Sequence, residues 1–292
     1  MNSSNKTVVI TGCSSGFGEG AVTAFADNGY RVWGTLRDAQ ERNAAKKDAL
    51  EAYSSLVSVI DMDVTDDASV EAAFDQILAQ GPVDVLINNA GVMYLGITEA
   101  FSIAQAKEQM ETNYFGAIRA MQAVLPGMRA AGSGLIINTS SLVGQISPPF
   151  FSTYSATKHA LEAYTQGLRY EIAGLGIDVA LVEPGPFGTG LLAGGQAPTN
   201  GDVLEGYGDL AGVPAAMGQH FADFLQSDEA PSPELVVDAY LALAEMPAGK
   251  RPTRTVVGIT WGVDEMNAAT QPIQDRVLQE MQLEGVLGGT DA

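Results

Sequence analysis

Short apolar runs alternate with longer amphipathic stretches along most of the chain. The apolar runs occupy residues 7–11, 31–36, 56–60, 83–88, 135–139, 178–183 and 253–259. Their length and their bounding turn residues predict buried strands, and the apolar residues between them recur at helical spacing. Strands that alternate with helices predict an α/β fold, a doubly wound parallel sheet of about seven strands flanked by helices.

Two segments do not fit this alternation. Residues 188–232 are a long Gly/Ala-rich insertion, and residues 262–292 follow the last predicted strand. The length of the insertion indicates a substrate lid. In the carboxyl-terminal extension, apolar residues of 271–283 share one helix face, which suits a cover over the lid or a contact with a neighbouring subunit. Because no Pro/Ser-rich linker or internal repeat interrupts the chain, we expect one domain over 1–292.

A glycine-rich turn follows the first predicted strand directly, as TGCSSGFG at 11–18. Gly12 permits a tight turn, Gly16 lets the backbone approach a pyrophosphate, and Gly18 allows close helix packing. The helix that follows offers free N–H groups at its amino end. Strand, glycine turn and helix in this order predict dinucleotide binding, whereas the glycines alone would also suit an ordinary turn. The other residues of this turn expected to contact the dinucleotide are Ser14, Ser15 and Phe17.

Tyr154 and Lys158 stand one helical turn apart in YSATK, and Ser141 follows the apolar run upstream of them. Spacing i to i+4 places the phenol and the amine on one helix face. A neighbouring ammonium stabilises a phenolate, so we expect Lys158 to lower the pKa of Tyr154 from the usual value of about 10. The trio predicts acid–base chemistry, although an isolated YxxxK is short and would suit two exposed residues equally well.

Six motifs in order make the chain resemble the short-chain dehydrogenase/reductases over roughly residues 6–260. These motifs are TGxxxGxG at 11–18, NNAG at 88–91, Asn113 in ETNYFG, Ser141, the pair Tyr154 and Lys158, and the PG pair Pro184 and Gly185. TGCSSGFG and VWGTLRD are locally similar to the steroid- and retinoid-converting branch. The resemblance implies a compact Rossmann-type oxidoreductase that transfers a hydride between a nicotinamide dinucleotide and a carbonyl or alcohol.

The same resemblance implies four catalytic residues. Tyr154 is the expected acid or base, and Ser141 is expected to hydrogen-bond the substrate oxygen. Ser140 is its neighbour, and only one of the two side chains can face the cofactor if both lie on a strand. Lys158 is expected to hold the nicotinamide ribose and to act on the phenol. Asn113 is expected to kink its helix and to hold a water that connects the lysine to solvent.

The end of the second predicted strand favours NADP(H) over NAD(H). An acidic residue there would bind the ribose hydroxyls of NAD and repel a 2′-phosphate, but the chain has Leu36 and then Arg37. A guanidinium matches phosphate oxygens bidentately. Asp38 offers an alternative partner for Arg37, which leaves an exposed strand-end arginine as the other interpretation. The remaining expected cofactor contacts are Asp63, Val64, Asn89, Ala90, Gly91, Pro184, Gly185, Phe187 and Thr189, together with Tyr154 and Lys158.

Apolar residues gather around the expected catalytic group and predict a hydrophobic substrate. They are Met93 after NNAG, Phe150 and Phe151 before Tyr154, and Leu191, Met217 and Phe221 in the predicted lid. With Ser141 and Tyr154 they form the expected substrate site, although several would equally fill the core. We expect a bulky ketone, aldehyde or alcohol, because no basic cluster in the lid suits a carboxylate or phosphate.

Composition excludes several other functions. A net charge of −20 disfavours nucleic acid and anionic membranes, and no apolar stretch reaches membrane-spanning length. Cys13 is the only cysteine, and with only His159 and His220 no zinc ligand set is expected. Because neither a membrane-spanning stretch nor a signal sequence is recognisable, we expect a cytoplasmic protein. The resemblance implies a homodimer or homotetramer, because 105–129 and 154–173 correspond to the usual dimer surface of the family.

Two alternative functions stay open. One is an NAD-dependent catabolic alcohol dehydrogenase. A role of Arg37 in binding the 2′-phosphate would distinguish an NADP(H) enzyme from it. The other is a regulator that binds the dinucleotide without turnover. Such proteins generally lose the tyrosine and the lysine, and this chain keeps both.

Overall fold

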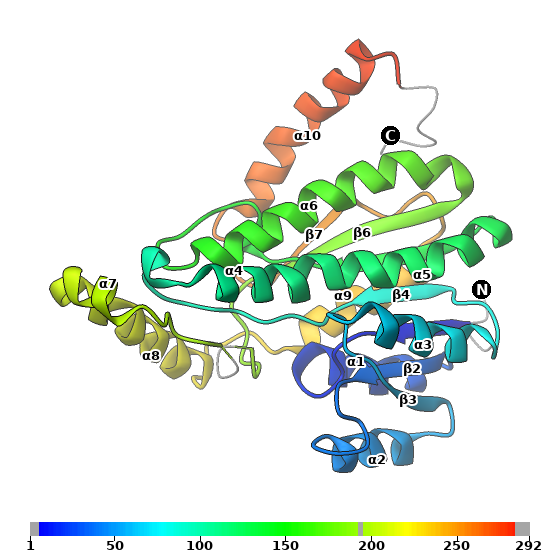
Figure 1. The fold of residues 1–292 in the computed structure, drawn as a ribbon. Helices are drawn as coiled ribbons and strands as arrows, with labels where there is room; N and C mark the ends of the chain where they lie inside the picture. Colours follow the sequence, from blue (N-terminus) through cyan, green and yellow to red (C-terminus); the bar gives the residue numbers. More distant parts are fainter. Residues whose placement is uncertain (1–5, 192–194, 284–292) are drawn as a thin grey trace.

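A seven-stranded, wholly parallel sheet forms the centre of the molecule (Figure 1). The structure, a computed structural model, describes residues 6–191 and 195–283. The strands are β1 (Thr7–Ile10), β2 (Arg31–Leu36), β3 (Val57–Asp61), β4 (Val85–Asn88), β5 (Gly134–Thr139), β6 (Ile177–Pro184) and β7 (Arg254–Val257). All seven predicted strands are confirmed, with each boundary within two residues.

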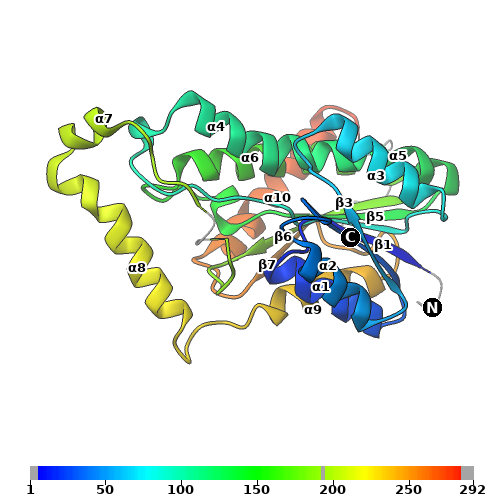
Figure 2. The ribbon, with the colours of Figure 1, turned by 60° about the horizontal axis from the view of Figure 1, so that its bottom comes forward.

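Helices cover both faces of the sheet, as the alternating pattern predicts (Figure 2). One face carries α1 (Gly16–Asp27), α2 (Ala44–Tyr53) and α9 (Glu234–Glu245), and the other carries α3 (Asp67–Leu78), α4 (Ile103–Met110), α5 (Gly116–Ala131) and α6 (Ser152–Ile172). Successive strand residues point to opposite faces, so Val8 and Ile10 join the core under α1 and α9, while Val9 joins the core under α3, α5 and α6. The strands are therefore buried on both sides, which explains their continuous apolar runs.

The strand order β3-β2-β1-β4-β5-β6-β7 reverses direction between β1 and β4. In open parallel sheets, ligands bind beyond the carboxyl ends of the strands at this reversal. The glycine turn after β1 and the NNAG residues after β4 therefore meet at one edge of the sheet. Thr11 joins them, since its Oγ1 accepts hydrogen bonds from the backbone N–H groups of Asn89 and Ala90, both at 3.0 Å.

The predicted lid and the carboxyl-terminal extension are both helical. The lid segment contains α7 (Gly201–Gly206), the 3₁₀ turn η5 (Gly208–Gly212) and α8 (Val213–Leu225). The extension forms α10 (Val263–Glu280), which begins earlier than the predicted helix and stands apart from α8 in Figures 1 and 2. Ile273, Val277 and Met281 are exposed on α10, and only Leu278 of the predicted apolar face is buried. The last predicted residues of the extension, 284–292, lie outside the described residues.

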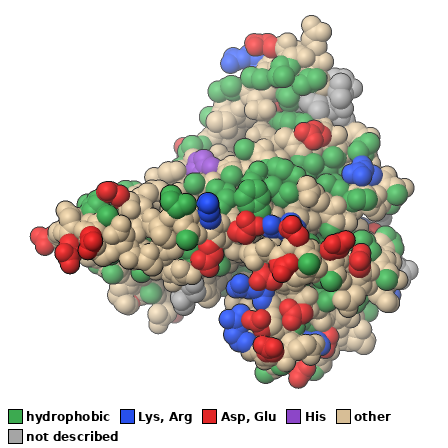
Figure 3. Space-filling view, viewed as in Figure 1, with side chains coloured by type: hydrophobic (Ala, Val, Ile, Leu, Met, Phe, Trp, Pro, Cys, Tyr) green, Lys and Arg blue, Asp and Glu red, His purple; other side chains and the backbone are tan. Residues whose placement is uncertain are grey.

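Apolar and acidic side chains are unevenly distributed over the surface (Figure 3). Apolar side chains gather over the middle of the molecule, where α4, α5 and α6 lie, and acidic side chains cover the tip formed by the lid segment. Phe115 and Ile103 are among the exposed apolar residues. Within 6–191 and 195–283, no helix is both long and apolar enough to cross a bilayer.

Candidate active site

A cavity of about 330 Å³ opens at the carboxyl ends of the strands. Most of the predicted site residues line it: Gly12, Ser14, Ser15, Gly16, Phe17, Arg37, Asp63, Val64, Asn89, Ala90, Gly91, Met93, Ser141, Phe151, Tyr154, Lys158, Pro184, Gly185, Phe187, Thr189, Leu191 and Phe221. Gly18, Asn113, Phe150 and Met217 are not among its lining residues. One pocket therefore receives both the predicted dinucleotide contacts and the predicted catalytic group.

The glycine turn has the backbone geometry that a pyrophosphate cradle needs. Gly12 and Gly16 have φ angles of +73° and +60°, which side chains disfavour. A Cβ on Gly12 would lie 2.7 Å from Ala90 Cα, and one on Gly18 would lie 2.4 Å from Gly12 O. Gly18 therefore permits close packing behind the turn rather than lining the cavity. Ser15 precedes α1 without a side-chain cap, so the first N–H groups of α1 are available to an anion.

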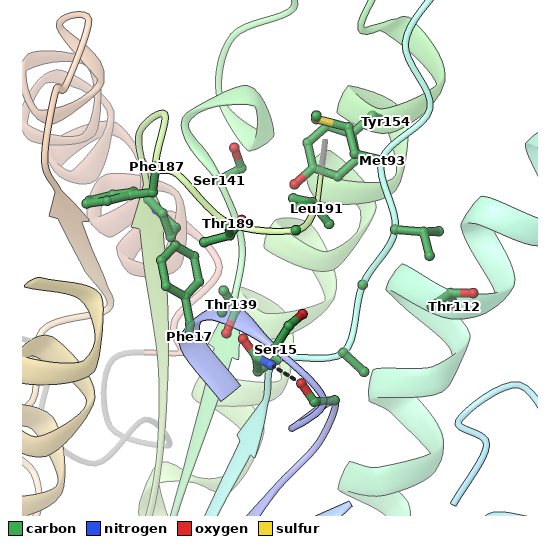
Figure 4. Close-up of a pocket in the computed structure, with 18 of the residues that line it drawn as sticks. Ser15, Phe17, Met93, Thr112, Thr139, Ser141, Tyr154, Phe187, Thr189 and Leu191 are labelled. Atoms are coloured by element: carbon green, nitrogen blue, oxygen red, sulfur yellow. Dashed lines mark hydrogen bonds between the residues drawn. The ribbon is translucent and has the colours of Figure 1, made fainter. Parts of the chain in front are cut away.

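The loop after β6 lies over this turn. A Cβ on Gly16 would lie 3.2 Å from Thr189 Cβ, and the rings of Phe17 and Phe187 meet edge to face with centroids 5.5 Å apart. In Figure 4, Phe17 and Phe187 lie together on one side of the pocket, and Tyr154 and Met93 lie on the other. These two sides suit a dinucleotide and an apolar substrate, respectively. The glycine turn therefore fits the pyrophosphate of a dinucleotide, and the loop after β6 lies where the rest of that cofactor would bind.

Tyr154, Lys158 and Ser141 meet at the end of β5. The ammonium of Lys158 donates to Thr139 O at 2.7 Å and lies 5.7 Å from the centroid of the Tyr154 ring. Tyr154 and Lys158 are each only 5% exposed. The Ser141 hydroxyl acts to lower the pKa of the phenol, whereas Ser140 packs against Gly144 with its hydroxyl buried. Ser141 is therefore better placed than Ser140 to act on Tyr154, and its contact with substrate stays a prediction.

The expected direction of the Tyr154 pKa is corrected by the structure. Burial raises the pKa of Tyr154 above its ordinary value, and the Ser141 hydroxyl acts in the lowering direction. The prediction from spacing considered only the neighbouring charge and left out the cost of burying a phenolate. Burial also lowers the pKa of Lys158 to about 8, against the opposing effect of Glu162. Tyr154 is therefore protonated at neutral pH, and Lys158 titrates first.

Asn113 lies in a π-helical turn, η2 (Glu111–Phe115), between α4 and α5. Its side chain is buried and donates to Val92 O at 2.8 Å and to Thr157 Oγ1 at 3.0 Å, while its Oδ1 accepts from Val92 N at 2.8 Å. Thr157 in turn donates to Tyr154 O at 2.8 Å. Asn113 thus ties the segment after β4 to the catalytic helix α6, and its water-holding role stays a prediction.

Two arginines reach the cavity near the end of β2, whereas the sequence analysis predicted only Arg37 there. Arg37 lies 3.7 Å from Asp63, and Arg42, which the sequence analysis missed, pairs with Asp38 at 2.7 Å. Both arginines line the cavity with Leu36. Asp38 therefore pairs with Arg42 and not with Arg37, the partner that the sequence had offered. Arg42 follows no motif, and only the fold of the loop after β2 brings it to the pocket.

The apolar side of the pocket is a compact cluster of Met93, Val143, Phe151 and Tyr154. Leu191, Met217 and Phe221 pack against it, so Met217 supports the wall without lining the cavity. Phe150 does not line the cavity, and its contact with substrate stays a prediction. Phe150 has φ +72° and its carbonyl accepts from Gly96 N, so it shapes the turn before α6 while Phe151 lines the pocket.

Trp261, which the sequence analysis did not select, also lines the cavity. Its φ of +48° is rare for a bulky residue, and its ring lies 6.3 Å from that of Phe221 in α8. The loop before it packs on the PG turn, because a Cβ on Gly185 would lie 2.3 Å from Ile259 O. The start of the carboxyl-terminal extension therefore reaches the mouth of the pocket, which sequence spacing did not indicate.

Cys13 and His159 are each held by a backbone carbonyl. Burial raises the pKa of the Cys13 thiol to about 12, and its Sγ donates to Ile10 O at 3.1 Å. His159 bonds the carbonyl of Ser155 within α6. In 6–191 and 195–283 no group of three or more His, Cys, Asp or Glu side chains is placed to hold a metal.

Comparisons with known proteins agree with this geometry. The family model for short chain dehydrogenase matches residues 6–198, so the chain belongs to the short-chain dehydrogenase family. It is 41% identical over 184 residues to 3-ketodihydrosphingosine reductase of Bacteroides thetaiotaomicron, covering 63% of this chain and 64% of the relative. It is 40% identical over 189 residues to Homo sapiens retinol dehydrogenase 8, covering 64% of this chain and 60% of the relative. The chain thus spans less than two thirds of the length of either relative.

Solved structures match over more of the chain. A short-chain dehydrogenase from Streptomyces avermitilis is 32% identical with a TM-score of 0.77, covering 97% of both chains. An alcohol dehydrogenase from Thermococcus sibiricus, complexed with 5-hydroxy-NADP, is 25% identical with a TM-score of 0.70, covering 88% of this chain and 97% of that chain. Both solved structures therefore share the fold of this chain over most of its length.

Gly12→Ala tests the cradle. The new methyl group collides with Ala90, and a left-handed alanine costs roughly 1–2 kcal/mol, so we expect NADPH binding to weaken about tenfold or more while the fold persists. The measurement is titration of NADPH fluorescence, with circular dichroism for the fold. Gly127→Ala, whose Cβ meets nothing within 4 Å, is the matched control. Equal affinity in both variants would contradict the assignment.

Proposed function

We propose that this protein is an NADP(H)-dependent oxidoreductase that interconverts a bulky hydrophobic ketone or aldehyde with its alcohol. The proposal is carried by three features that line one cavity: a pyrophosphate cradle, the group of Ser141 with the buried Tyr154 and Lys158, and an apolar wall. Residues 1–292 act as one catalytic domain, with 188–232 as the substrate lid.

The preference for NADP(H) is supported by the end of β2. Leu36 presents no carboxylate there, and Arg37 and Arg42 both reach the cavity. Their ion pairs with Asp63 and Asp38 are exposed, so breaking them for a phosphate costs little. A guanidinium gains more from a doubly charged phosphate than from these carboxylates. An NAD-dependent alcohol dehydrogenase is the second candidate, because Asp63 itself is a carboxylate beside the adenosine end.

The bound dinucleotide supplies or accepts the hydride at its nicotinamide ring. Tyr154 is protonated at neutral pH because burial raises its pKa, so its hydroxyl donates a proton to the carbonyl oxygen during reduction. Ser141 donates a hydrogen bond to the same oxygen, where negative charge develops. The ammonium of Lys158 stabilises the phenolate left behind, and Asn113 holds α6 in register with the segment after β4.

The substrate side is apolar. Met93, Val143, Phe151 and Leu191 form the wall, and Phe221 and Trp261 stand at its mouth. Two relatives are named as a 3-ketodihydrosphingosine reductase and a retinol dehydrogenase, which agrees with a substrate of this kind. The protein works as a homodimer or homotetramer through α5 and α6, near the exposed Phe115.

The direct test follows NADPH and NADH absorbance with a panel of apolar ketones, aldehydes and alcohols. Turnover with NADPH and a bulky apolar carbonyl supports the proposal. Dinucleotide binding without turnover of any compound would favour a regulator instead.

Arg37→Leu tests the cofactor preference. Loss of a charge-assisted contact to the 2′-phosphate should raise KM for NADPH about 10- to 100-fold and leave KM for NADH nearly unchanged. Arg31→Leu, at the opposite end of β2, is the control and should change neither value. Steady-state kinetics with both cofactors provide the readout, and equal effects on NADPH and NADH would contradict a phosphate contact.

Trp261→Ala tests whether the aromatic pair Phe221 and Trp261 at the opening of the cavity contacts the substrate. Because the ring pair with Phe221 would be lost, we expect KM for bulky apolar substrates to rise roughly fivefold, with kcat and KM for NADPH little changed. Ile259→Ala, in the same loop but exposed and outside the cavity lining, is the control. If Trp261→Ala leaves KM unchanged across the panel, Trp261 makes no contact with substrate.

A further inference from the structure

The lid segment is attached to the body of the protein by a short stem, residues 196–200, which forms neither helix nor strand. The backbone groups of such a stem need hydrogen-bond partners outside it. Their partners lie in α4 and in the 3₁₀ turn η1 (Thr98–Ala100) that precedes it. Asn200 N donates to Ala100 O at 3.1 Å. Figure 2 shows α7 next to α4, with α8 extending away from both.

Gln105 of α4 is the centre of this attachment, and its side chain is 5% exposed. Its Nε2 donates to Ala197 O at 2.8 Å, and its Oε1 accepts from Thr199 Oγ1 at 3.0 Å. An amide offers both a donor and an acceptor, so this one side chain bonds two residues of the stem. The partners lie 92 and 94 residues later in the sequence, so these bonds join two distant parts of the chain.

The role of Gln105 as a helix cap does not account for these bonds. Ser102 and Gln105 form a capping box at the start of α4. In it, Gln105 Oε1 accepts from Ser102 N and Ser102 Oγ accepts from Gln105 N, both at 3.1 Å. The box leaves the Nε2 donors of Gln105 unused. The bond from Nε2 to Ala197 O is therefore additional to the cap, and it serves the stem.

The stem also touches the segment that supports the apolar side of the cavity. A Cβ on Gly96 would lie 2.4 Å from Pro198 Cγ, so glycine is required for the stem to lie this close. Gly96 N donates to Phe150 O at 3.1 Å, in the turn before α6. The neighbouring Leu95 packs against the apolar cluster of the pocket. A displaced stem would therefore disturb the substrate side before it reached the cofactor side.

The position of α8 depends on this attachment. Of the residues of α8, all of which the structure describes, Pro214 alone is buried. Met217 and Phe221 pack against the apolar cluster of the pocket while staying partly exposed. Because so little of α8 is buried, packing alone holds it weakly against the body. The stem leads into α8 through α7 and η5, whereas the exposed residues 226–229 follow its other end.

We propose that Gln105 is a positioning residue for substrate binding, because its amide holds the stem on α4 and so keeps Met217 and Phe221 at the apolar side of the cavity. This inference rests on the proposed function, in which 188–232 covers the substrate. Gln105 lies outside the cavity lining. It therefore acts through the lid, on the binding of bulky apolar substrates and not on the hydride step.

Gln105→Met tests this role, because methionine keeps the length of the side chain and lacks the amide. We expect KM for a bulky apolar ketone to rise about fivefold, with kcat and the dissociation constant of NADPH little changed. Thr199→Val removes a partner of Gln105 Oε1 and should raise KM in the same direction. The two substitutions combined should raise KM no further than Gln105→Met alone, since they remove the same contact. Steady-state kinetics at saturating NADPH provide the readout.

Ser102→Ala is the matched control, since it removes the capping hydroxyl and leaves the amide of Gln105 in place. Its KM should equal that of the wild type. An equal rise of KM in Ser102→Ala and Gln105→Met would mean that Gln105 acts only on the stability of α4, and would overturn the proposal. An unchanged KM in Gln105→Met, or a loss confined to kcat, would overturn it as well.

Hydrogen exchange measured by mass spectrometry gives a readout that needs no substrate. Amide exchange in 200–212 should be about fivefold faster in Gln105→Met and faster in Thr199→Val, but unchanged in Ser102→Ala. Thr199 is exposed on the stem, so Thr199→Val leaves α4 intact even where Gln105→Met disturbs it. Unchanged exchange in both stem variants overturns the proposal. A wild-type protein that turns over no substrate refutes the proposed function, while this exchange measurement still decides whether Gln105 holds the stem.

Discussion

The ammonium of Lys158 is buried at the carboxyl end of β5, where it donates a hydrogen bond to the Thr139 carbonyl. Keeping a charge there requires fixed polar partners, since burial alone favours the neutral amine. The rest of the site follows from this constraint. Thr139 must end its strand beside the ammonium, and α6 must present the phenol and the amine on one face. Asn113 helps to fix that face through Thr157.

Burial also raises the pKa of the Tyr154 phenol. Because Tyr154 lies among Met93, Val143 and Phe151, it stays protonated and is ready to donate rather than accept at neutral pH. In the proposed function the apolar wall therefore serves two purposes, since it would bind a hydrophobic substrate and keeps the phenol of Tyr154 protonated. The glycine turn and the two arginines at the end of β2 form a separate, polar half of the cavity.

Local patterns predicted the strands, the glycine turn and the Ser–Tyr–Lys group, because strand burial and i, i+4 spacing are local properties. They did not predict Arg42 or Trp261, which reach the cavity through loop conformations, one of them at a rare positive φ. They also gave the wrong direction for the pKa of Tyr154, because desolvation depends on the packing of residues far apart in the sequence. Phe150 and Phe151 differ only in backbone conformation, which composition does not reveal.

The most direct measurement is the turnover of Tyr154→Phe with NADPH and an apolar ketone, together with its affinity for NADPH. The substitution removes one hydroxyl group and keeps the ring in the wall. We expect kcat to fall about 10²- to 10⁴-fold, with the NADPH dissociation constant nearly unchanged. Turnover at the wild-type rate would contradict proton donation by Tyr154 and with it the account of this site.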